Sequence, residues 1–194
     1  EGVSSSLLGE FTAAGIKLEG LSALEVSTIA VQAKVQDMAE SLAANAQDRA
    51  EGREAVAIIH LGVSSGAERI QLECRGVNVA DFRIPDVRGF VAKGQPIVEA
   101  SEPTLYTSLR LPEILGEMRD RGVECDISTD AGRYICNYMF YSSLHAARPL
   151  DVPVLFVHVP TFDTMDCIKQ LTAVLVLLLA VARQLRGSGP AGAA

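Results

Sequence analysis

The sequence predicts an α/β fold, a three-layer α/β/α sandwich with a mostly parallel twisted sheet. Strand-like and helix-like segments alternate along most of the 194 residues, which is typical of this class. Residues 55–61 (AVAIIHL) form a nearly continuous apolar run, as expected for a strand covered on both faces. A second apolar run, residues 152–159 (VPVLFVHV), precedes a long helical pattern. Helices should therefore cover both sides of the sheet.

The first half of the chain supplies both kinds of element. Residues 4–14 are helix-like with serine caps, residues 23–28 (ALEVST) alternate like a strand, and residues 31–44 form an amphipathic helix. The apolar run 55–61 should be a central strand of the sheet. Residues 69–79 are strand-like but less regular.

The second half begins with a segment rich in proline. Pro85, Pro96 and Pro103 exclude a long helix over residues 80–104 and predict loop or edge structure. After it, helix and strand patterns alternate again and end in a helix. The expected ranges are 113–121 (helix), 123–128 (strand), 133–147 (helix), 152–159 (strand) and 165–185 (helix).

Length and charge limit the function classes. A chain of 194 residues should form one domain, over residues 1–186, and the small residues 187–194 should be a flexible tail. The formal net charge of −7 leaves no basic face for phosphates. Nucleic acids and anionic membrane surfaces are therefore not expected as partners.

The cysteines indicate a reducing compartment. The four lack the paired spacing of a zinc site and are too sparse for a disulfide scaffold, so no metal or other cofactor is expected and a cytoplasmic location fits best. The longest apolar run, residues 173–182, is shorter than the ~20 residues that a membrane-spanning helix needs. Apolar faces of the helices at 133–147 and 165–185 could pack internally or against a second copy, so a homo-oligomer is possible.

The nonapeptide DAGRYICNY, residues 130–138, is the most informative motif. Asp130, Ala131 and Gly132 supply turn and cap residues between a strand and a helix, so Cys136 should lie in the first helical turn. Unpaired backbone N–H groups and the positive end of the helix dipole favour a thiolate there. Cys136 is therefore a candidate nucleophile, although free cysteines are commonly inert core residues.

A thiol nucleophile needs an imidazole to take and return its proton, and a carboxylate or amide to orient that imidazole. His60 and His158 both lie near the ends of predicted strands, whereas His145 lies within a predicted helix. Glu73 lies in the largely apolar segment IQLEC, where a buried charge would require a partner. An ordinary surface carboxylate on an edge strand explains Glu73 equally well.

Three separated blocks resemble the cysteine-type pyroglutamyl peptidases, also called pyrrolidone carboxyl peptidases. They are HLGVSSGAERIQLECRGVNVADFRIPD (60–86), DISTDAGRYICNY (126–138) and FVHVP (156–160), and their order along the chain agrees with the family. A weaker likeness covers residues 103–122, so the resemblance extends over most of the chain from Leu21 onward.

The resemblance implies roles for five residues. Cys136 matches the nucleophile, His158 the general base and acid, and Glu73 the third member of a triad, which makes His60 structural. Arg83 is expected near the reacting carbonyl, and Val63 is expected to offer backbone groups to the pyroglutamyl ring. The implied reaction removes an N-terminal pyroglutamyl residue from a peptide through a thioester, without a metal.

The sequence also departs from the family pattern. The family opens with a strand and a GFxPFGG-like loop that walls the pyroglutamyl pocket, and nothing like it occurs before Ser4. The join between residues 160 and 165 is tighter than the family's usual loop. We expect that the molecule carries the opening segment, and a longer loop near Phe162, in addition to the residues printed above.

Two alternatives stay open at this point. The chain could be a catalytically silent relative that binds peptides or partners, or an unrelated cysteine-dependent hydrolase of another acyl group. Hydrolysis of a pyroglutamyl amide that is lost on Cys136→Ala would favour the peptidase over the first alternative, the silent relative. Cleavage of substrates with a free α-amine would favour the second.

Overall fold

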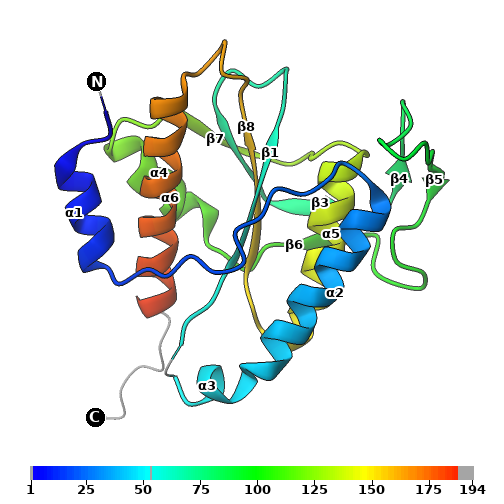
Figure 1. Cartoon of the computed structure of the whole chain (residues 1–194), viewed down its shortest axis with the longest axis horizontal. Coiled ribbons are helices and arrows are strands. Elements are labelled where there is room, and N and C mark those ends of the chain that lie inside the picture. Colours follow the sequence, from blue (N-terminus) through cyan, green and yellow to red (C-terminus); the bar gives the residue numbers. More distant parts are fainter. Residues whose placement is uncertain (1, 53, 188–194) are drawn as a thin grey trace.

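The computed structural model describes residues 2–52 and 54–187 (Figure 1), so the predicted flexible tail from residue 188 onward lies outside the described residues. The helices are α1 (Ser5–Ala13), α2 (Thr28–Ala44), α3 (Ala46–Ala50), α4 (Leu111–Asp120), α5 (Ile135–Ala147), the 3-10 turn η1 (Arg148–Leu150) and α6 (Cys167–Gly187). The strands are β1 (Ile58–Val63), β2 (Ile70–Glu73), β3 (Arg75–Val77), β4 (Ala80–Asp81), β5 (Lys93–Gln95), β6 (Thr104–Tyr106), β7 (Cys125–Ser128) and β8 (Val154–Val159).

The central sheet has the strand order β1-β8-β2-β7. The pairs β1–β8 and β2–β7 are parallel, and only the β2–β8 pair is antiparallel. Helices α1, α4 and α6 lie on one side of this sheet and α2 and α5 on the other (Figure 1). The predicted three-layer α/β/α architecture with a mostly parallel sheet is therefore confirmed.

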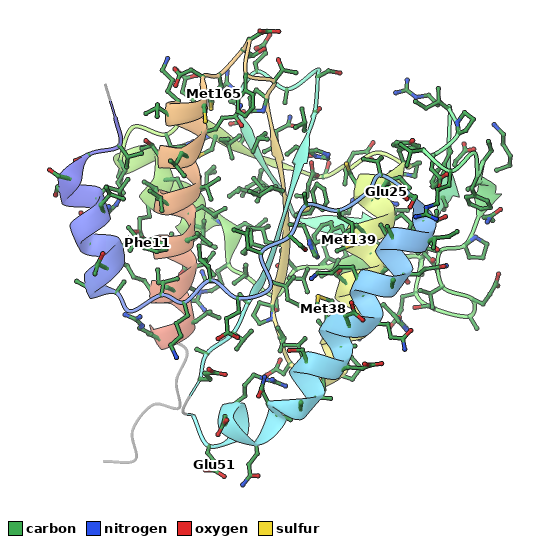
Figure 2. All side chains as sticks on the ribbon, in the orientation of Figure 1. Phe11, Glu25, Met38, Glu51, Met139 and Met165 are labelled. Atoms are coloured by element: carbon green, nitrogen blue, oxygen red, sulfur yellow. The ribbon has the colours of Figure 1, made fainter. Side chains whose placement is uncertain are left out.

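Two apolar cores lie on the two faces of the sheet, and side chains fill both spaces, with Phe11 of α1 on one side and Met139 of α5 on the other (Figure 2). All six residues of β8 are buried, and their side chains alternate between the cores as the two-residue period of a strand requires. Leu155, Val157 and Val159 join the core of α4 and α6, whereas Val154 and Phe156 join the core of α2 and α5. His158 has the same parity as Val154 and Phe156 and so faces α5.

Two predicted strands differ from the structure. The apolar run 55–61 supplies β1, whose residues pack into both cores, but β1 pairs only with β8 and is an edge strand of the described sheet rather than a central one. A continuous apolar run reports burial of both faces, which does not require a neighbour on both sides.

The other difference concerns residues 23–28, which do not form a strand. Ser27 instead caps α2 by accepting a hydrogen bond from the Ala30 N–H, and Asp86 accepts from the Thr28 N–H and hydroxyl. Helix capping therefore uses backbone groups that a strand would need for its ladder.

Helix α6 is long and apolar enough to cross a membrane by length and composition alone, with a mean hydropathy of 1.6 over its most apolar window. Half of that window is buried inside the fold, and the helix packs on α4 and α1. Core helices of globular proteins pass the same test, and the buried side of α6 contributes to the core between the sheet and α4.

Candidate active site

The strand-to-helix turn places Cys136 where the sequence predicts it. After β7 ends at Ser128, Gly132 adopts a left-handed backbone with φ of 78°, and the Asp130 carboxylate accepts from its N–H at 3.1 Å. Cys136 is the second residue of α5, and the prediction that it lies in the first helical turn is confirmed. The residue before the helix, Tyr134, makes no side-chain capping bond, so the first N–H groups of α5 remain available to an anion.

His158 and Glu73 form a buried pair behind the thiol. The Nδ1 of His158 lies 2.7 Å from the Oε1 of Glu73, and the two residues are 7% and 0% exposed. Glu73 lies opposite Phe156 in the β2–β8 register, which makes His158 its diagonal neighbour on the same face. The second carboxylate oxygen of Glu73 has no hydrogen-bond partner among the described residues. A proton on Nδ1 of His158 is therefore what stabilises this buried carboxylate.

The charge of His158 is set by its neighbours. Burial lowers the pKa of the imidazole, but hydrogen bonds to Cys136 and Glu73 and their negative charges outweigh burial and raise the pKa of His158 to about 9. At neutral pH the ring is accordingly a cation between a sulfur and a carboxylate. Such a ring can stabilise a thiolate and later deliver a proton.

Gly62 is a residue of this site that sequence reasoning missed. It lies opposite His158 in the β1–β8 register, and a Cβ at this position would lie 2.7 Å from the Cζ of Phe156 and 3.2 Å from the Sγ of Cys136. Only a glycine lets β1 pass this close to the sulfur. The available signal was the glycine inside the apolar strand segment HLGV.

The other two histidines have hydroxyl partners outside this site. The Nε2 of His60 lies 2.9 Å from the Oγ of Ser143, and burial, together with the positive charge of Lys34, lowers the pKa of His60 to about 4. His145 is exposed, and its Nδ1 lies 3.2 Å from the Oγ of Ser101. His60 is therefore a neutral, hydrogen-bonded side chain of the α2–α5 core.

Arg83 and Val63 remain predictions. Arg83 is exposed in the loop between β4 and β5, and within the described residues no hydrogen bond or ion pair joins its guanidinium to Cys136, His158 or Glu73. Val63 is the last residue of β1, next to Gly62, and its side chain is 66% exposed. The structure thus brings Cys136, His158 and Glu73 together, whereas Arg83 and Val63 are exposed side chains.

The loop that carries Arg83 is fastened by several hydrogen bonds that the sequence did not predict. The buried Asp86 carboxylate accepts four hydrogen bonds, two from Thr28 and two from the N–H groups of Arg88 and Phe90. The Tyr134 phenol, two residues before Cys136, donates to the Pro85 carbonyl at 3.0 Å. The loop is therefore fastened both to the start of α2 and to the residue before α5.

The remaining cysteines differ from Cys136 in their surroundings. Burial raises the pKa of Cys74 and of Cys125, which disfavours their thiolates, and Cys167 is exposed at the start of α6. All four thiols are free. No group of three or more metal-ligating side chains occurs within residues 2–52 and 54–187.

Comparison with known proteins agrees with this arrangement. A model of the pyroglutamyl peptidase family matches residues 12–183. The pyrrolidone-carboxylate peptidase of Pyrococcus furiosus is 36% identical over 104 residues, which cover 53% of this chain and 50% of the relative. That of Deinococcus radiodurans is 40% identical over 108 residues, which cover 54% and 49%. The aligned part of the chain thus spans about half the length of the curated relatives it matches.

Solved structures are similar over a larger share of the chain. A variant pyrrolidone carboxyl peptidase from Pyrococcus furiosus superposes with a TM-score of 0.72 at 26% identity and covers 91% of this chain and 90% of its own. The pyrrolidone carboxyl peptidase of Thermus thermophilus has a TM-score of 0.65 at 27% identity, with 92% and 91% covered. The chain therefore belongs to the pyroglutamyl peptidase family.

Proposed function

We propose that the protein is a cysteine exopeptidase that removes an N-terminal pyroglutamyl residue from peptides through a thioester acyl-enzyme. The observation that carries the proposal is the buried contact of 2.7 Å between His158 Nδ1 and Glu73 Oε1, with Cys136 close enough to the same imidazole to raise its pKa. Membership of the family supports the pyroglutamyl substrate. No observation favours a catalytically silent relative.

In the proposed reaction the Cys136 thiolate attacks the pyroglutamyl carbonyl and forms a carbon–sulfur bond. The tetrahedral intermediate collapses as the His158 imidazolium gives its proton to the departing amine, which leaves as a peptide with a free N-terminus. The now neutral imidazole takes a proton from water, and the resulting hydroxide attacks the thioester. Pyroglutamate is released, and the proton on His158 faces the Cys136 thiolate again.

Glu73 would act by orienting the ring and stabilising its positive charge, because its only partner among the described residues is His158. The N–H groups at the start of α5 would stabilise the oxyanion, at about 3 kcal/mol per donor in comparable sites. Arg83 would assist near the carbonyl, and backbone groups of Val63 would bind the ring. A lactam carries no α-ammonium, so the ring pocket should lack charged side chains.

The setting of the enzyme is part of the proposal. Residues 1–186 would form a single domain, and four free thiols suit a reducing, cytoplasmic location. Its partners would be peptides that begin with pyroglutamate. Whether the protein forms a homo-oligomer stays a prediction.

Release of a fluorophore from a pyroglutamyl amide tests the proposal. The wild-type protein should cleave this substrate and spare the matching glutaminyl amide, whose free α-ammonium the pocket should reject. Cys136→Ala should abolish cleavage, whereas Cys167→Ala, which removes an exposed thiol elsewhere, should not. Wild-type protein without turnover would favour the silent relative, and cleavage of the glutaminyl amide would favour another hydrolase.

A further inference from the structure

Asn137, the residue after the candidate nucleophile, is a fully buried polar side chain in the first turn of α5. Its Oδ1 accepts from the Val77 N–H at 2.8 Å, and its Nδ2 donates to the carbonyl oxygens of Val77 at 2.8 Å and Val79 at 3.1 Å. Both hydrogens of the amide nitrogen and one lone pair of its oxygen are used. The amide therefore makes three specific bonds to the backbone of one neighbouring segment.

That segment is the chain that leaves the Glu73 strand. Glu73 ends β2, and β3 follows after one residue and ends at Val77. The intervening Cys74 N–H donates to the Ser128 carbonyl at 2.8 Å, which fixes the segment at its start as well. Val77, the first residue that Asn137 binds, thus follows Glu73 by only four positions along the chain.

The contact between β3 and α5 is also close in space. A Cβ at Gly76 would lie 2.9 Å from the Cα of Tyr141, which is one helical turn beyond Asn137 on the same side of α5. The Tyr141 phenol lies 2.9 Å from the Oγ of Ser101. The bonds of Asn137 therefore fasten α5 to β3, and the missing side chain of Gly76 allows the two backbones to pack closely.

We propose that Asn137 is a positioning residue, which fixes the first turn of α5 against the chain leaving β2 and thereby sets the Cys136 thiol relative to the His158–Glu73 pair. The proposal rests on the proposed function for its kinetic consequences only. The geometry of a thiol and an imidazole matters because misplacement of about 1 Å costs roughly 100-fold in rate. Asn137 itself touches no reacting atom.

The test compares Asn137→Ala with a matched change at a second buried asparagine. Asn78 is 8% exposed, accepts from the N–H groups of Ile97 and Val98, and donates to the Val98 carbonyl. Asn78 lies between Val77 and Val79, in the segment that Asn137 binds, but its side chain fastens that segment to residues 97–98 and, among the described residues, makes no hydrogen bond to α5. Both variants lose several buried hydrogen bonds to backbone, so both should unfold at lower urea concentration.

Two readouts separate positioning from general destabilisation. The first is kcat and KM on a pyroglutamyl amide. The second is the rate of alkylation of Cys136 by iodoacetamide relative to the exposed Cys167, measured by mass spectrometry of the labelled peptides on folded protein. The alkylation ratio requires no turnover and so stays informative if the proposed function fails.

Asn137→Ala should lower kcat by roughly 10- to 100-fold with KM changed less than about twofold, because the substrate still binds but the thiol is misplaced. The alkylation ratio should fall by at least about fivefold, since a displaced thiol loses the imidazolium that stabilises its thiolate. Asn78→Ala leaves the three bonds of Asn137 to Val77 and Val79 in place, so it should keep both values within about twofold of wild type. Asn137→Asp, which keeps the acceptor for Val77, should lie between wild type and Asn137→Ala.

Three results would overturn the proposal. One is a folded Asn137→Ala protein with the wild-type alkylation ratio. Another is an equal loss in Asn78→Ala, which would show that the bonds of Asn137 to Val77 and Val79 have no specific role in placing the thiol. The last applies if Asn137→Ala does not fold: a wild-type alkylation ratio and kcat in Asn137→Asp would then exclude a positioning role.

Discussion

Two histidines on neighbouring parallel strands of one sheet differ in charge at neutral pH, since His60 is neutral and His158 is a cation. His60 of β1 lies opposite Phe156 of β8, and His158 lies two residues further along β8 on the same face. The Phe156 ring lies between them, with centroid distances of 6.2 Å to His60 and 5.0 Å to His158. The pKa is lowered to about 4 in His60 and raised to about 9 in His158.

The difference comes from the partners and not from burial. Burial lowers the pKa of both rings, and it is the largest single effect on each. His60 has a neutral hydroxyl as its partner, whereas His158 has a carboxylate and the Cys136 thiol. The comparison teaches that an imidazole packed inside this fold stays protonated at neutral pH only where the fold places anionic partners beside it.

Substituting each histidine in turn should give the largest difference between the two positions. His158→Ala should lower kcat/KM for a pyroglutamyl amide by roughly 1,000-fold, because the proton donor and the stabiliser of the thiolate are both lost. His60→Gln, which keeps a hydrogen-bonding group near Ser143, should change kcat/KM less than about threefold. Steady-state kinetics on both variants check this, and equal losses would mean that both rings take part.

Removing the negative charge of Glu73 should bring the pKa of His158 closer to that of His60. Glu73→Gln keeps the shape but removes the charge, so the pKa of His158 should fall from its value of about 9. The alkaline limb of the kcat/KM profile should move to lower pH, and kcat/KM at pH 8 should fall on the order of 100-fold. Titration of the His158 ring by NMR measures the shift directly, and an unchanged titration would contradict the assigned cause.

Gly62→Ala tests the close approach of β1 to the sulfur. The new methyl group would lie 2.7 Å from a ring carbon of Phe156 and 3.2 Å from the Cys136 sulfur. We expect a loss of about 1–3 kcal/mol of unfolding free energy and roughly tenfold in kcat/KM. Gly116→Ala in α4 is the control, because nothing lies within 4 Å of its Cβ, and it should leave activity unchanged. A Gly62→Ala protein with wild-type activity would show that the site accommodates the added methyl group.

The smallest effect expected is on the pH dependence of stability. His158 binds a proton more tightly in the folded protein, so its contribution is complete below pH 6.5 and is lost as the pH rises through about 9. His60 resists protonation in the fold, so the folded state loses stability as the pH falls from 6.5 through about 4. Urea midpoints between these limits should show a flatter alkaline arm in Glu73→Gln and a flatter acid arm in His60→Gln. Identical curves in the three proteins would refute the assignment.

Local signals were sufficient to predict the parts of the site that depend on local geometry. The turn residues before Cys136 predict its place in the first turn of α5, and the period of a strand places His158 on the same face as Phe156. The pairing of His158 with Glu73 follows the family resemblance, because 85 residues separate the two and spacing alone leaves Glu73 ambiguous.

Features set by distant contacts could not be predicted in this way. β1 is an edge strand because it pairs only with β8, and the pattern of apolar residues in 55–61 contains no information about which strands pair with it. The capping of α2 depends on Asp86, which lies 58 residues away. Gly62 matters because β1 passes close to Cys136, and Asn137 matters because it bonds to residues 60 positions away in the sequence. Neither contact can be predicted from the composition or the local pattern.

The most direct test of the central claim is to trap the acyl-enzyme. Protein mixed with a pyroglutamyl amide and quenched in acid should carry one pyroglutamyl group as a thioester on the peptide that contains Cys136, as read by mass spectrometry. The adduct should be present in wild-type protein quenched during turnover, strongly reduced in His158→Ala, which lacks the proton donor for the departing amine, and absent from Cys136→Ala. Turnover without any adduct on Cys136, or an adduct on Cys74, Cys125 or Cys167 instead, would contradict the account.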